Sequence, residues 1–333
     1  MSHAWSVSAR TPRTDVGVEA ASYYLPAERL TVEEWVKRHG YTDKQAASLR
    51  ASGHSELYVA NDLTAVEMAC CAVERLIGSL PSFDPLQVEV IIHCCSTQHT
   101  TPPAPYSAPV CVQGEFGFNN ARCFSICQLN CVSVLAAFKA ARALLSERRA
   151  CGAVLIVSSD RESNEEYRVN TDFTAIGSDA ASAALVVPES APNRIGAIAI
   201  KNYSALNAGV SLATLQKNIV RQRLIEWTAV HDVVRTSMND GLGEGTAFLR
   251  LLPSNLGERG WFGVAKRLGR EPDFVYTKNI GDKGHASCAD PIINLLDSGG
   301  LYLPGGAAVV IGCQSNNGAY GAMTLHGPPK PEG

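Results

Sequence analysis

Cys131 stands where the sequence changes from a short apolar segment to an amphipathic helical pattern. The segment "CFSIC" ends four residues before it, and "VSVLAAFKAA" follows it directly, with Val132 and Leu135 on one face and Lys139 on the other. A cysteine in the first turn of a helix meets free backbone N–H groups and the positive end of the helix dipole, which favour a thiolate. The position by itself leaves two readings open, which are a buried structural cysteine as the default and a nucleophilic thiol whose neighbouring N–H groups hold an oxyanion.

The other cysteines are expected to pack as small hydrophobic residues. The chain has 11 cysteines, most of them in apolar segments such as "VEMACCAVERLIG" and "VEVIIHCCST". No CxxC pair and no paired Cys/His spacing typical of a metal site occurs, so neither a metal nor a disulfide framework is predicted. Cys127, four residues before Cys131, falls in the strand-like segment and is expected to pack.

The composition is that of a globular protein and disfavours several kinds of partner. The 333 residues are 46% hydrophobic and 18% charged, with a formal net charge of -3. This length suits one large or two medium domains, and the small net charge predicts no nucleic acid or anionic membrane as a partner. The N-terminal residues lack an apolar secretory core, and no apolar run reaches the ~18 residues that span a bilayer, so a cytoplasmic location is expected.

Strand-like and helix-like patterns alternate and predict an α/β layered fold. Apolar, β-branched runs predict strands that are covered on both faces, and amphipathic runs between them predict helices. The strands are predicted at 88–94, 152–159, 180–187, 194–200 and 307–313, and the helices at 64–80, 132–149, 215–238, 260–269 and 290–299. Prolines from Pro102 to Pro109 mark one long loop. Each half of the chain repeats the order of apolar strand, polar or reactive turn, and helix.

Five motifs occur in one order over residues 15–326. "ASYYLPAERLTVEEW" is similar to an opening strand with a Tyr-Leu-Pro turn, and "CCSTQHTTPPA" to a Thr/Ser, His and Pro loop. "CFSICQLNCVSVLAAFKAARALL" follows, with Cys131 at the place of a nucleophile. "GSDAASAALVV" is similar to a Gly-Asp-Gly-Ala-Gly-Ala strand, and "AAVVIGCQSNNGAYGAMTLH" to a glycine-rich closing segment. As an ordered set, these motifs resemble the ketoacyl-ACP synthase III branch of the thiolase superfamily.

The resemblance implies a five-layered α/β/α/β/α thiolase-like fold of two pseudo-repeated halves. Residues 15–188 are expected to carry the nucleophilic cysteine and residues 189–326 the histidine, in a homodimer. No bound cofactor is implied, since coenzyme A or phosphopantetheine carries the acyl group as a thioester of CoA or of an acyl carrier protein. Asn316 is the closest match to the family's second oxyanion N–H. Arg50 resembles an arginine near the coenzyme A entrance, and Arg259 is a candidate for the phosphopantetheine phosphate or an acidic carrier.

The sequence departs from the family at its two other catalytic positions. The family has a His in Pro-His-Gln-Ala-Asn and an Asn in Gly-Asn-Thr-Ser, which together bind the thioester carbonyl and help expel carbon dioxide from a malonyl group. Ser254 stands at the His position and His285 at the Asn position. A serine hydroxyl is no base near neutral pH, whereas a Cys/His pair is sufficient for acyl transfer. Asp282 and Asp290 are the nearby carboxylates that are candidates to orient the imidazole.

These departures predict an acyltransferase, and the resemblance implies a role in specialised (natural product) or fatty-acid-related metabolism. An acyl group on Cys131 passes to an oxygen or nitrogen nucleophile of a small-molecule acceptor, with His285 as the base. The alternatives are a decarboxylative 3-oxoacyl synthase and a non-catalytic partner subunit. Phe124 and Cys131 are seven residues apart, one more than is usual in the family, and the extra residue falls in "QLN". Asn130 in that turn has no assigned role and is grouped with Ser254 and Asn316 as a candidate binding residue.

Overall fold

The computed structural model describes residues 16–103, 105–147, 152–188, 192–203, 212–241, 246–315 and 317–328, with the backbone alone for 212–224. Its main feature is one mixed sheet of nine strands. In sheet order the strands are β5 (Arg122–Ile126), β4 (Val88–Cys94), β6 (Ala153–Asp160), β7 (Ala180–Pro188), β1 (Val16–Tyr24), β8 (Asn193–Asn202), β11 (Ala319–His326), β10 (Ala307–Gln314) and β9 (Ala247–Pro253).

The two sides of this sheet repeat one topology. β4 pairs in parallel with β5 and β6, and β6, β7 and β1 then alternate in direction. On the other side β9 and β10 are parallel, and β10, β11 and β8 alternate in the same way. A parallel bridge between Leu251 and Val275 lies beside β9, as β5 lies beside β4. The segments that lead to Cys131 and to His285 therefore hold equivalent places in two pseudo-repeated halves, whereas the division at residues 188 and 189 stays a prediction.

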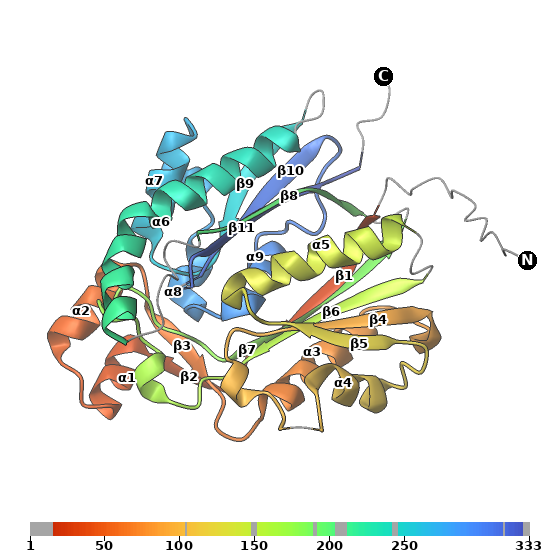
Figure 1. Cartoon of the computed structure of the whole chain (residues 1–333), viewed down its shortest axis with the longest axis horizontal. Coiled ribbons are helices and arrows are strands. Elements are labelled where there is room, and N and C mark those ends of the chain that lie inside the picture. The colour runs from red at the N-terminus through yellow and green to blue at the C-terminus, as the bar shows by residue number, and fades with distance from the viewer. Residues whose placement is uncertain are drawn as a thin grey trace, which may run out of the picture.

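Helices form three layers around the two halves of the sheet, which gives the predicted order α/β/α/β/α (Figure 1). α3 (Ala65–Gly78) and α4 (Ala108–Phe116) cover one outer face, and α6 (Leu212–Asp240) and α7 (Glu258–Arg267) cover the other. α5 (Ser133–Ser146) and α9 (Asp290–Asp297) lie between the two halves, where their apolar side chains meet strands of both. The layers bury both faces of the sheet, as the continuous apolar strands require.

A smaller unit extends from one end of these layers. β2 (Glu28–Thr31) pairs with β3 (Glu56–Val59), and α1 (Val32–Arg38) and α2 (Asp43–Ala51) pack beside them. The fully buried indole of Trp35 lies in this cluster and stacks on Tyr41 at a ring distance of 5.2 Å. Burying an aromatic ring of this size stabilises the unit by roughly 1.5–3 kcal/mol.

Local sequence explains where several helices begin. α1, α2 and α3 each start after a threonine whose hydroxyl accepts the N3 backbone N–H, while the N3 Glu or Gln side chain accepts the threonine N–H. Such capping boxes satisfy backbone donors that the helix itself leaves free. Among the described residues no side chain caps α5, and the Ser133 N–H at its start donates instead to the Asn130 carbonyl of the preceding 3-10 turn.

The element boundaries agree with the sequence analysis to within a few residues, with one correction. The single loop expected through Pro109 ends sooner, because α4 begins at Ala108 and Pro109 lies in its first turn. Proline suits that position, since the first helical N–H groups have no intrahelical partner. Among the described residues, no helix has both the length and the hydropathy of a membrane span.

Candidate active site

Cys131 lies between β5 and α5, in a short 3-10 turn (Asn130–Val132) that runs directly into the helix. Its side chain is buried, with 7% exposed. The Asn130 N–H donates to the Cys127 carbonyl at 3.2 Å, and Asn130 has a φ of 47°. Asparagine enters this left-handed region more readily than most residues. Asn130, which had no assigned role, therefore shapes the turn that presents Cys131.

Cys131, His285 and Asp290 form one hydrogen-bonded line. The Cys131 Sγ is 3.3 Å from the His285 Nε2, and the His285 Nδ1 is 2.6 Å from the Asp290 Oδ2. The His285 side chain is 13% exposed and that of Asp290 is fully buried. Asp282, the other candidate, lies before the turn in α8 (Lys278–Lys283) and forms no hydrogen bond with His285 among the described residues. The structure thus assigns the contact to Asp290.

The backbone around His285 is held on both sides. The His285 N–H donates to the Ile176 carbonyl, and the Ser178 N–H donates to the His285 carbonyl, each at 2.9 Å. Gly284, one residue earlier, has a φ of 64°, and a Cβ there would lie 2.8 Å from the Ser178 Oγ and 3.2 Å from the Glu56 carbonyl oxygen. Only glycine meets both constraints, so the Gly284 position fixes where the imidazole enters the site.

Asp290 is anchored by backbone donors as well as by the imidazole. The Asn255 N–H donates to its Oδ2 and the Ala286 N–H to its Oδ1, both at 2.7 Å. The Asn255 side chain also donates to the Gly284 carbonyl at 2.9 Å. These contacts tie the end of β9 to the turn that carries His285. Asn255 was not singled out in the sequence, although it follows the Ser254 position directly.

Opposing effects act on the pKa of His285. Burial lowers it, whereas the negative charge of Asp290, the charge of the Cys131 sulfur and the hydrogen bonds to both raise it, and the net result lies well above the ordinary value of 6.5. A protonated ring between two anionic partners is the arrangement that a thiolate–imidazolium pair requires. The contacts therefore place the His285 imidazole where it can exchange a proton with the Cys131 sulfur.

Asp160, at the end of β6, is a fourth buried group that the sequence analysis missed. Its Oδ1 accepts the N–H groups of Ser96 and Thr97 at 2.6 and 2.8 Å, and its Oδ2 accepts the Cys288 N–H at 3.0 Å. Burial raises the pKa of Asp160, and these backbone donors oppose the rise. Because the Ser96 Oγ is 3.6 Å from the Cys131 Sγ, Asp160 positions segments on both sides of the sulfur. The signal was a carboxylate that directly follows the apolar strand "AVLIVSS".

Ser254 is fully buried, and its backbone is fixed between β9 and β10. Its N–H donates to the Gly312 carbonyl at 2.8 Å, and its carbonyl accepts the Trp261 Nε1–H at 3.0 Å. Within the described part of the chain, its hydroxyl has no hydrogen-bond partner. Ser254 is thus held rigidly beside Asn255 with one polar atom unsatisfied.

The candidate residues at the entrance lie in different settings. Arg50 forms two hydrogen bonds of 2.6 Å with the Glu33 carboxylate on the surface. Arg259 is exposed at the start of α7 and lines a cavity. Asn316, the predicted second oxyanion donor, lies outside the described residues. The structure therefore separates Arg50 from the cavity that Arg259 lines.

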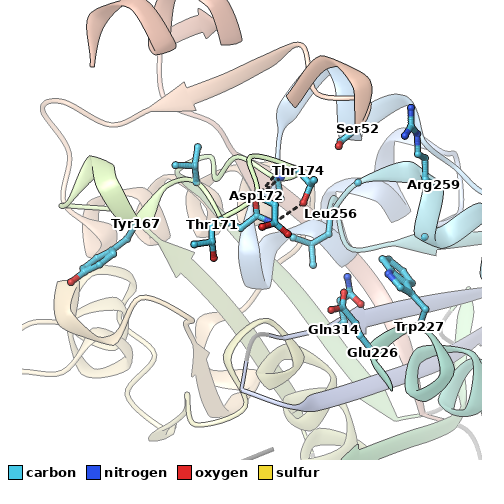
Figure 2. A pocket seen from close by; sticks show the side chains of 15 residues that line it. Ser52, Tyr167, Thr171, Asp172, Thr174, Glu226, Trp227, Leu256, Arg259 and Gln314 are labelled. Carbon is cyan, nitrogen blue, oxygen red and sulfur yellow. Dashed lines mark hydrogen bonds between the residues drawn. The ribbon is translucent and has the colours of Figure 1, made fainter. Parts of the chain in front are cut away.

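This cavity has a volume of about 700 Å³ and opens between the loop 167–175, the end of α2 and the start of α7. Figure 2 shows Arg259 at one side, with Trp227 and Gln314 below it and Thr171 and Asp172 opposite. The catalytic candidates Cys131, His285 and Asp290 do not line it. Two of its lining residues connect it to the catalytic candidates. Leu256 directly follows Asn255, and Gln314 ends β10, which packs against the turn that carries Cys131. A cavity of this size suits a small-molecule ligand or the arm of a carrier.

Cys127 departs from the expectation that it packs as a hydrophobic residue. The Cys95 S–H donates to the Cys127 Sγ at 3.3 Å, and His93 lies beside the pair. No local spacing indicates this cluster, because Cys95 follows β4 and Cys127 follows β5. Local Cys/His spacing cannot detect such a cluster.

Comparison with known proteins finds relatives among solved structures alone. No protein-family model and no curated protein matches the chain. An acyltransferase named ChlB3 has a TM-score of 0.80 at 16% identity, and covers 95% of this chain and 98% of its own. FabH, the 3-oxoacyl-(acyl carrier protein) synthase III of Pseudomonas aeruginosa, has a TM-score of 0.75 at 18% identity, with coverage of 94% and 98%. OleA of Xanthomonas campestris has a TM-score of 0.75 at 14% identity, with coverage of 95% and 99%.

The likeness spans nearly the whole of each chain and confirms the predicted fold class. The protein has the thiolase-like fold of the ketoacyl-ACP synthase III structures, with its layers in the order α/β/α/β/α. One fold supports several chemistries, so the reaction has to be argued from the site itself.

Proposed function

We propose that this protein is an acyltransferase that carries an acyl group on Cys131 from a coenzyme A or carrier-protein thioester to a hydroxyl or amine acceptor. The observation that carries the proposal is the contact of His285 with both Cys131 and Asp290, at 3.3 and 2.6 Å. A cysteine, a histidine and an orienting carboxylate in line are the parts needed for nucleophilic acyl transfer.

In the first half of the reaction, the Cys131 thiolate attacks the carbonyl carbon of the donor thioester. The C–S bond to the donor breaks, and the departing thiolate takes the proton from the His285 imidazolium. The products are acyl-Cys131 and a free carrier thiol. The backbone N–H groups of Cys131 and Asn316 are the proposed donors to the oxyanion, and the unsatisfied hydroxyl of Ser254 is a third candidate.

In the second half, the acceptor hydroxyl or amine gives its proton to the His285 Nε2 as it attacks the acyl carbon. The bond between that carbon and the Cys131 sulfur breaks, and the thiolate is restored beside the imidazolium. Asp290 keeps the proton on Nδ1 during this step, so that Nε2 is the free base. The site ends the cycle in the state in which it began.

Acylation itself prepares His285 for its second role. The charge of the Cys131 sulfur helps to raise the pKa of His285 in the free protein. A thioester sulfur carries no charge, so this contribution disappears in the acyl-enzyme and the pKa of His285 falls. The imidazolium needed for acylation thereby becomes a neutral base at the stage at which the acceptor must lose a proton.

We further propose that the protein acts as a homodimer joined at β5. β5 is the edge strand of the sheet, and its Phe124 is 40% exposed. An edge strand with an exposed aromatic side chain is a template for pairing with another strand. Light scattering during gel filtration measures the molar mass in solution, which is expected to be that of a dimer. The Phe124→Lys variant is expected to have the molar mass of a monomer.

Intact-mass analysis with a panel of acyl-CoA and acyl-carrier donors tests the function. The wild type is expected to gain one acyl mass that Cys131→Ala does not gain, and Cys71→Ser, in α3, serves as the thiol control. Release of the acyl group as an ester or amide with added alcohols or amines supports transfer. Failure of every donor to acylate Cys131 would leave a non-catalytic subunit as the better description.

Decarboxylative condensation is the second candidate. The likeness to the 3-oxoacyl synthase FabH is nearly as close as that to the acyltransferase ChlB3. Carbon dioxide released from a malonyl thioester by acylated wild type, with no transfer to alcohols or amines, would favour condensation and reject our proposal.

A further inference from the structure

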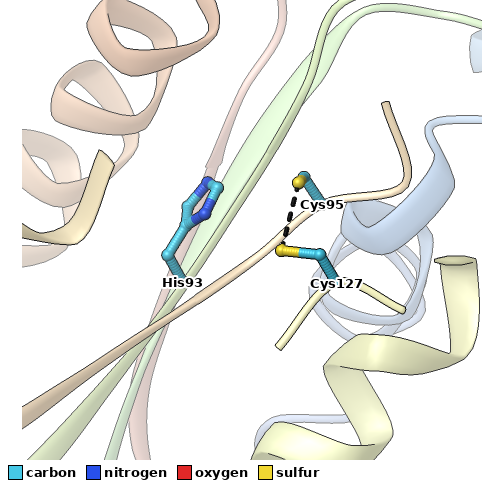
Figure 3. Close-up of side chains that lie close together, drawn as sticks. All are labelled: His93, Cys95 and Cys127. Carbon is cyan, nitrogen blue, oxygen red and sulfur yellow. Dashed lines mark hydrogen bonds between the residues drawn. The ribbon is translucent and has the colours of Figure 1, made fainter. Parts of the chain in front are cut away.

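Cys95 and Cys127 lie opposite each other at the ends of two adjacent parallel strands. β4 and β5 pair with His93 opposite Ser125 and Cys94 opposite Ile126, so Cys95 and Cys127 are the next pair in this register. Their sulfurs are 3.3 Å apart and face each other, as Figure 3 shows. The sheet itself sets this distance, because the register of its strands fixes both backbones.

The two sulfurs share one proton unequally. The hydrogen bond from the Cys95 S–H lowers the pKa of Cys127, burial opposes this, and His93 adds to the lowering. The same bond, together with burial, raises the pKa of Cys95. The contact therefore favours the thiolate form of Cys127 over that of Cys95, and thiolate character is what makes a cysteine reactive.

We propose that Cys95 and Cys127 are a site of oxidative modification, and that a hydroperoxide converts them to a reversible disulfide beside the active-site cysteine. Cys127 is half-buried whereas Cys95 is 1% exposed, so Cys127 is the sulfur that meets the oxidant.

The chemistry is balanced in two steps. The Cys127 thiolate attacks the terminal peroxide oxygen, the O–O bond breaks, and the sulfur becomes a sulfenic acid. The leaving group is hydroxide from hydrogen peroxide or an alkoxide from an organic hydroperoxide, and a proton from solvent converts it to water or the alcohol. The Cys95 sulfur then attacks the Cys127 sulfur, the S–S bond forms and the S–O bond breaks, and the departing hydroxide takes the Cys95 proton as water. The two cysteines lose two electrons, and the peroxide is reduced. A small thiol reverses the change by exchange, becoming a disulfide itself.

The geometry favours a disulfide over a metal. The sulfurs need to approach by about 1.2 Å to reach the S–S bond length of about 2.05 Å, and the ~4.8 Å spacing of adjacent strands lies within the Cα separation that a disulfide spans. Zinc bound at about 2.3 Å in a tetrahedral site holds two sulfurs about 3.8 Å apart, farther than the 3.3 Å seen here. The His93 Nε2 is also engaged with the Ser159 Oγ at 2.9 Å.

The pair is connected to Cys131 through both of its chain segments. The Cys127 carbonyl accepts the Asn130 N–H and closes the turn that presents Cys131. Cys95 is followed by Ser96, whose Oγ is 3.6 Å from the Cys131 Sγ. Drawing the two sulfurs together pulls on both segments, so the disulfide is expected to lower the rate of Cys131 acylation. This effect on rate rests on the proposed function, whereas the disulfide does not.

The test begins in the Cys131→Ala background, where the proposed catalytic thiol is absent. Hydrogen peroxide is expected to lower the intact mass by about 2 Da, and dithiothreitol to restore it, since a disulfide lacks two hydrogens. Peptide mapping after alkylation is expected to find Cys95 linked to Cys127. The Cys127→Ser change is expected to abolish the link, and Cys123→Ser in the same strand to retain it.

A gain of oxygen without a link, or a link between other cysteines, would overturn the proposal. Stoichiometric zinc in the purified protein that Cys127→Ser loses would do the same, since the pair would then be a metal site. The regulatory part has a separate readout in wild type. Peroxide is expected to cause a loss of acylation rate that dithiothreitol restores, and an equal restorable loss in Cys127→Ser would reject that part while leaving the disulfide and the acyl transfer standing.

Discussion

The Asp160 carboxylate accepts the backbone N–H of Cys288 at 3.0 Å, and so joins the end of β6 to the segment that follows His285. Its other oxygen holds the Ser96 N–H at 2.6 Å, next to the Cys131 sulfur. One buried side chain therefore sets the distance between the two halves at the place where Cys131 and His285 meet. The two proposed reacting groups come from different halves, and we infer that Asp160 is a positioning residue between them.

Asp160→Asn is expected to disturb that distance. An amide nitrogen cannot accept a hydrogen bond, so at least one backbone donor loses its partner and the free energy of unfolding falls by about 1–3 kcal/mol. The rate of Cys131 acylation is expected to fall with little change in KM, because the donor cavity is not touched. Single-turnover acylation followed by intact mass measures this. Ser158→Ala, a buried neighbour on β6, controls for stability, and an equal fall in rate there would argue against positioning.

Asp290→Asn is expected to change the pH dependence of the two half-reactions. In wild type the raised pKa of His285 lets the imidazolium, and with it the rate of acylation, persist up to alkaline pH. The transfer step needs the neutral ring, so the rate of transfer rises with pH. Without the Asp290 charge the pKa of His285 falls, so both limbs are expected to shift to lower pH and the rates to drop by roughly 10²–10⁴-fold. Quenched single-turnover experiments from pH 5 to pH 10 measure both limbs. If neither pH profile shifts in Asp290→Asn, the Asp290 charge does not control the pKa of His285.

The same pKa predicts how stability depends on pH. A histidine whose folded pKa lies above its unfolded value stabilises the protein fully below about pH 6.5, and this stabilisation is lost as pH rises through the folded pKa. The difference in free energy of unfolding between wild type and His285→Gln is therefore expected to shrink as pH rises. Urea titrations at a series of pH values measure it, with the partly exposed His99→Gln as control. A difference that grows with pH contradicts the assignment.

Gly284→Ala is expected to damage the site through backbone strain and a steric clash together. The change places a Cβ 2.8 Å from the Ser178 Oγ at a φ of 64°. Gly40→Ala is a matched control, because its φ is 72° and nothing lies within 4 Å of its Cβ. Both variants carry the strain of about 1–3 kcal/mol, and the additional loss in Gly284→Ala isolates the clash. Equal unfolding free energies for the two variants would show that Ser178 and Glu56 move to accommodate the added Cβ without loss of stability.

Arg259→Ala is expected to weaken donor binding while leaving chemistry intact. An exposed cation at the mouth of the cavity contributes about 0.2–1 kcal/mol to an anionic group, so KM for a CoA donor is expected to rise by up to ~5-fold at low salt and less at high salt. Steady-state kinetics at two salt concentrations test this. Lys266→Ala, on the exposed part of α7, is the control, and an equal rise there would indicate a general charge effect.

The sequence by itself indicated five of the strands and five of the helices, and it singled out Cys131 as the candidate nucleophile. Apolar β-branched runs predicted β4, β6, β7, β8 and β10, because strand and helix patterns depend on residues close together in the chain. Cys131 became a candidate for the same reason, since its junction between strand and helix is local, and the order of motifs then singled it out. His285 was found through the order of motifs, although its equivalence to the Cys131 position became visible with the pseudo-repeated topology.

Tertiary structure decided which residues act together. Asp282 and Asp290 both lie within five residues of His285 in the sequence, and the left-handed turn at Gly284 and the start of α9 direct Asp290 to the ring. Asp160 and the Cys95–Cys127 pair depend on the sheet, because strand register brings together residues that are 32 or more positions apart. No local pattern encodes that register, since it is fixed by packing on both faces of the sheet.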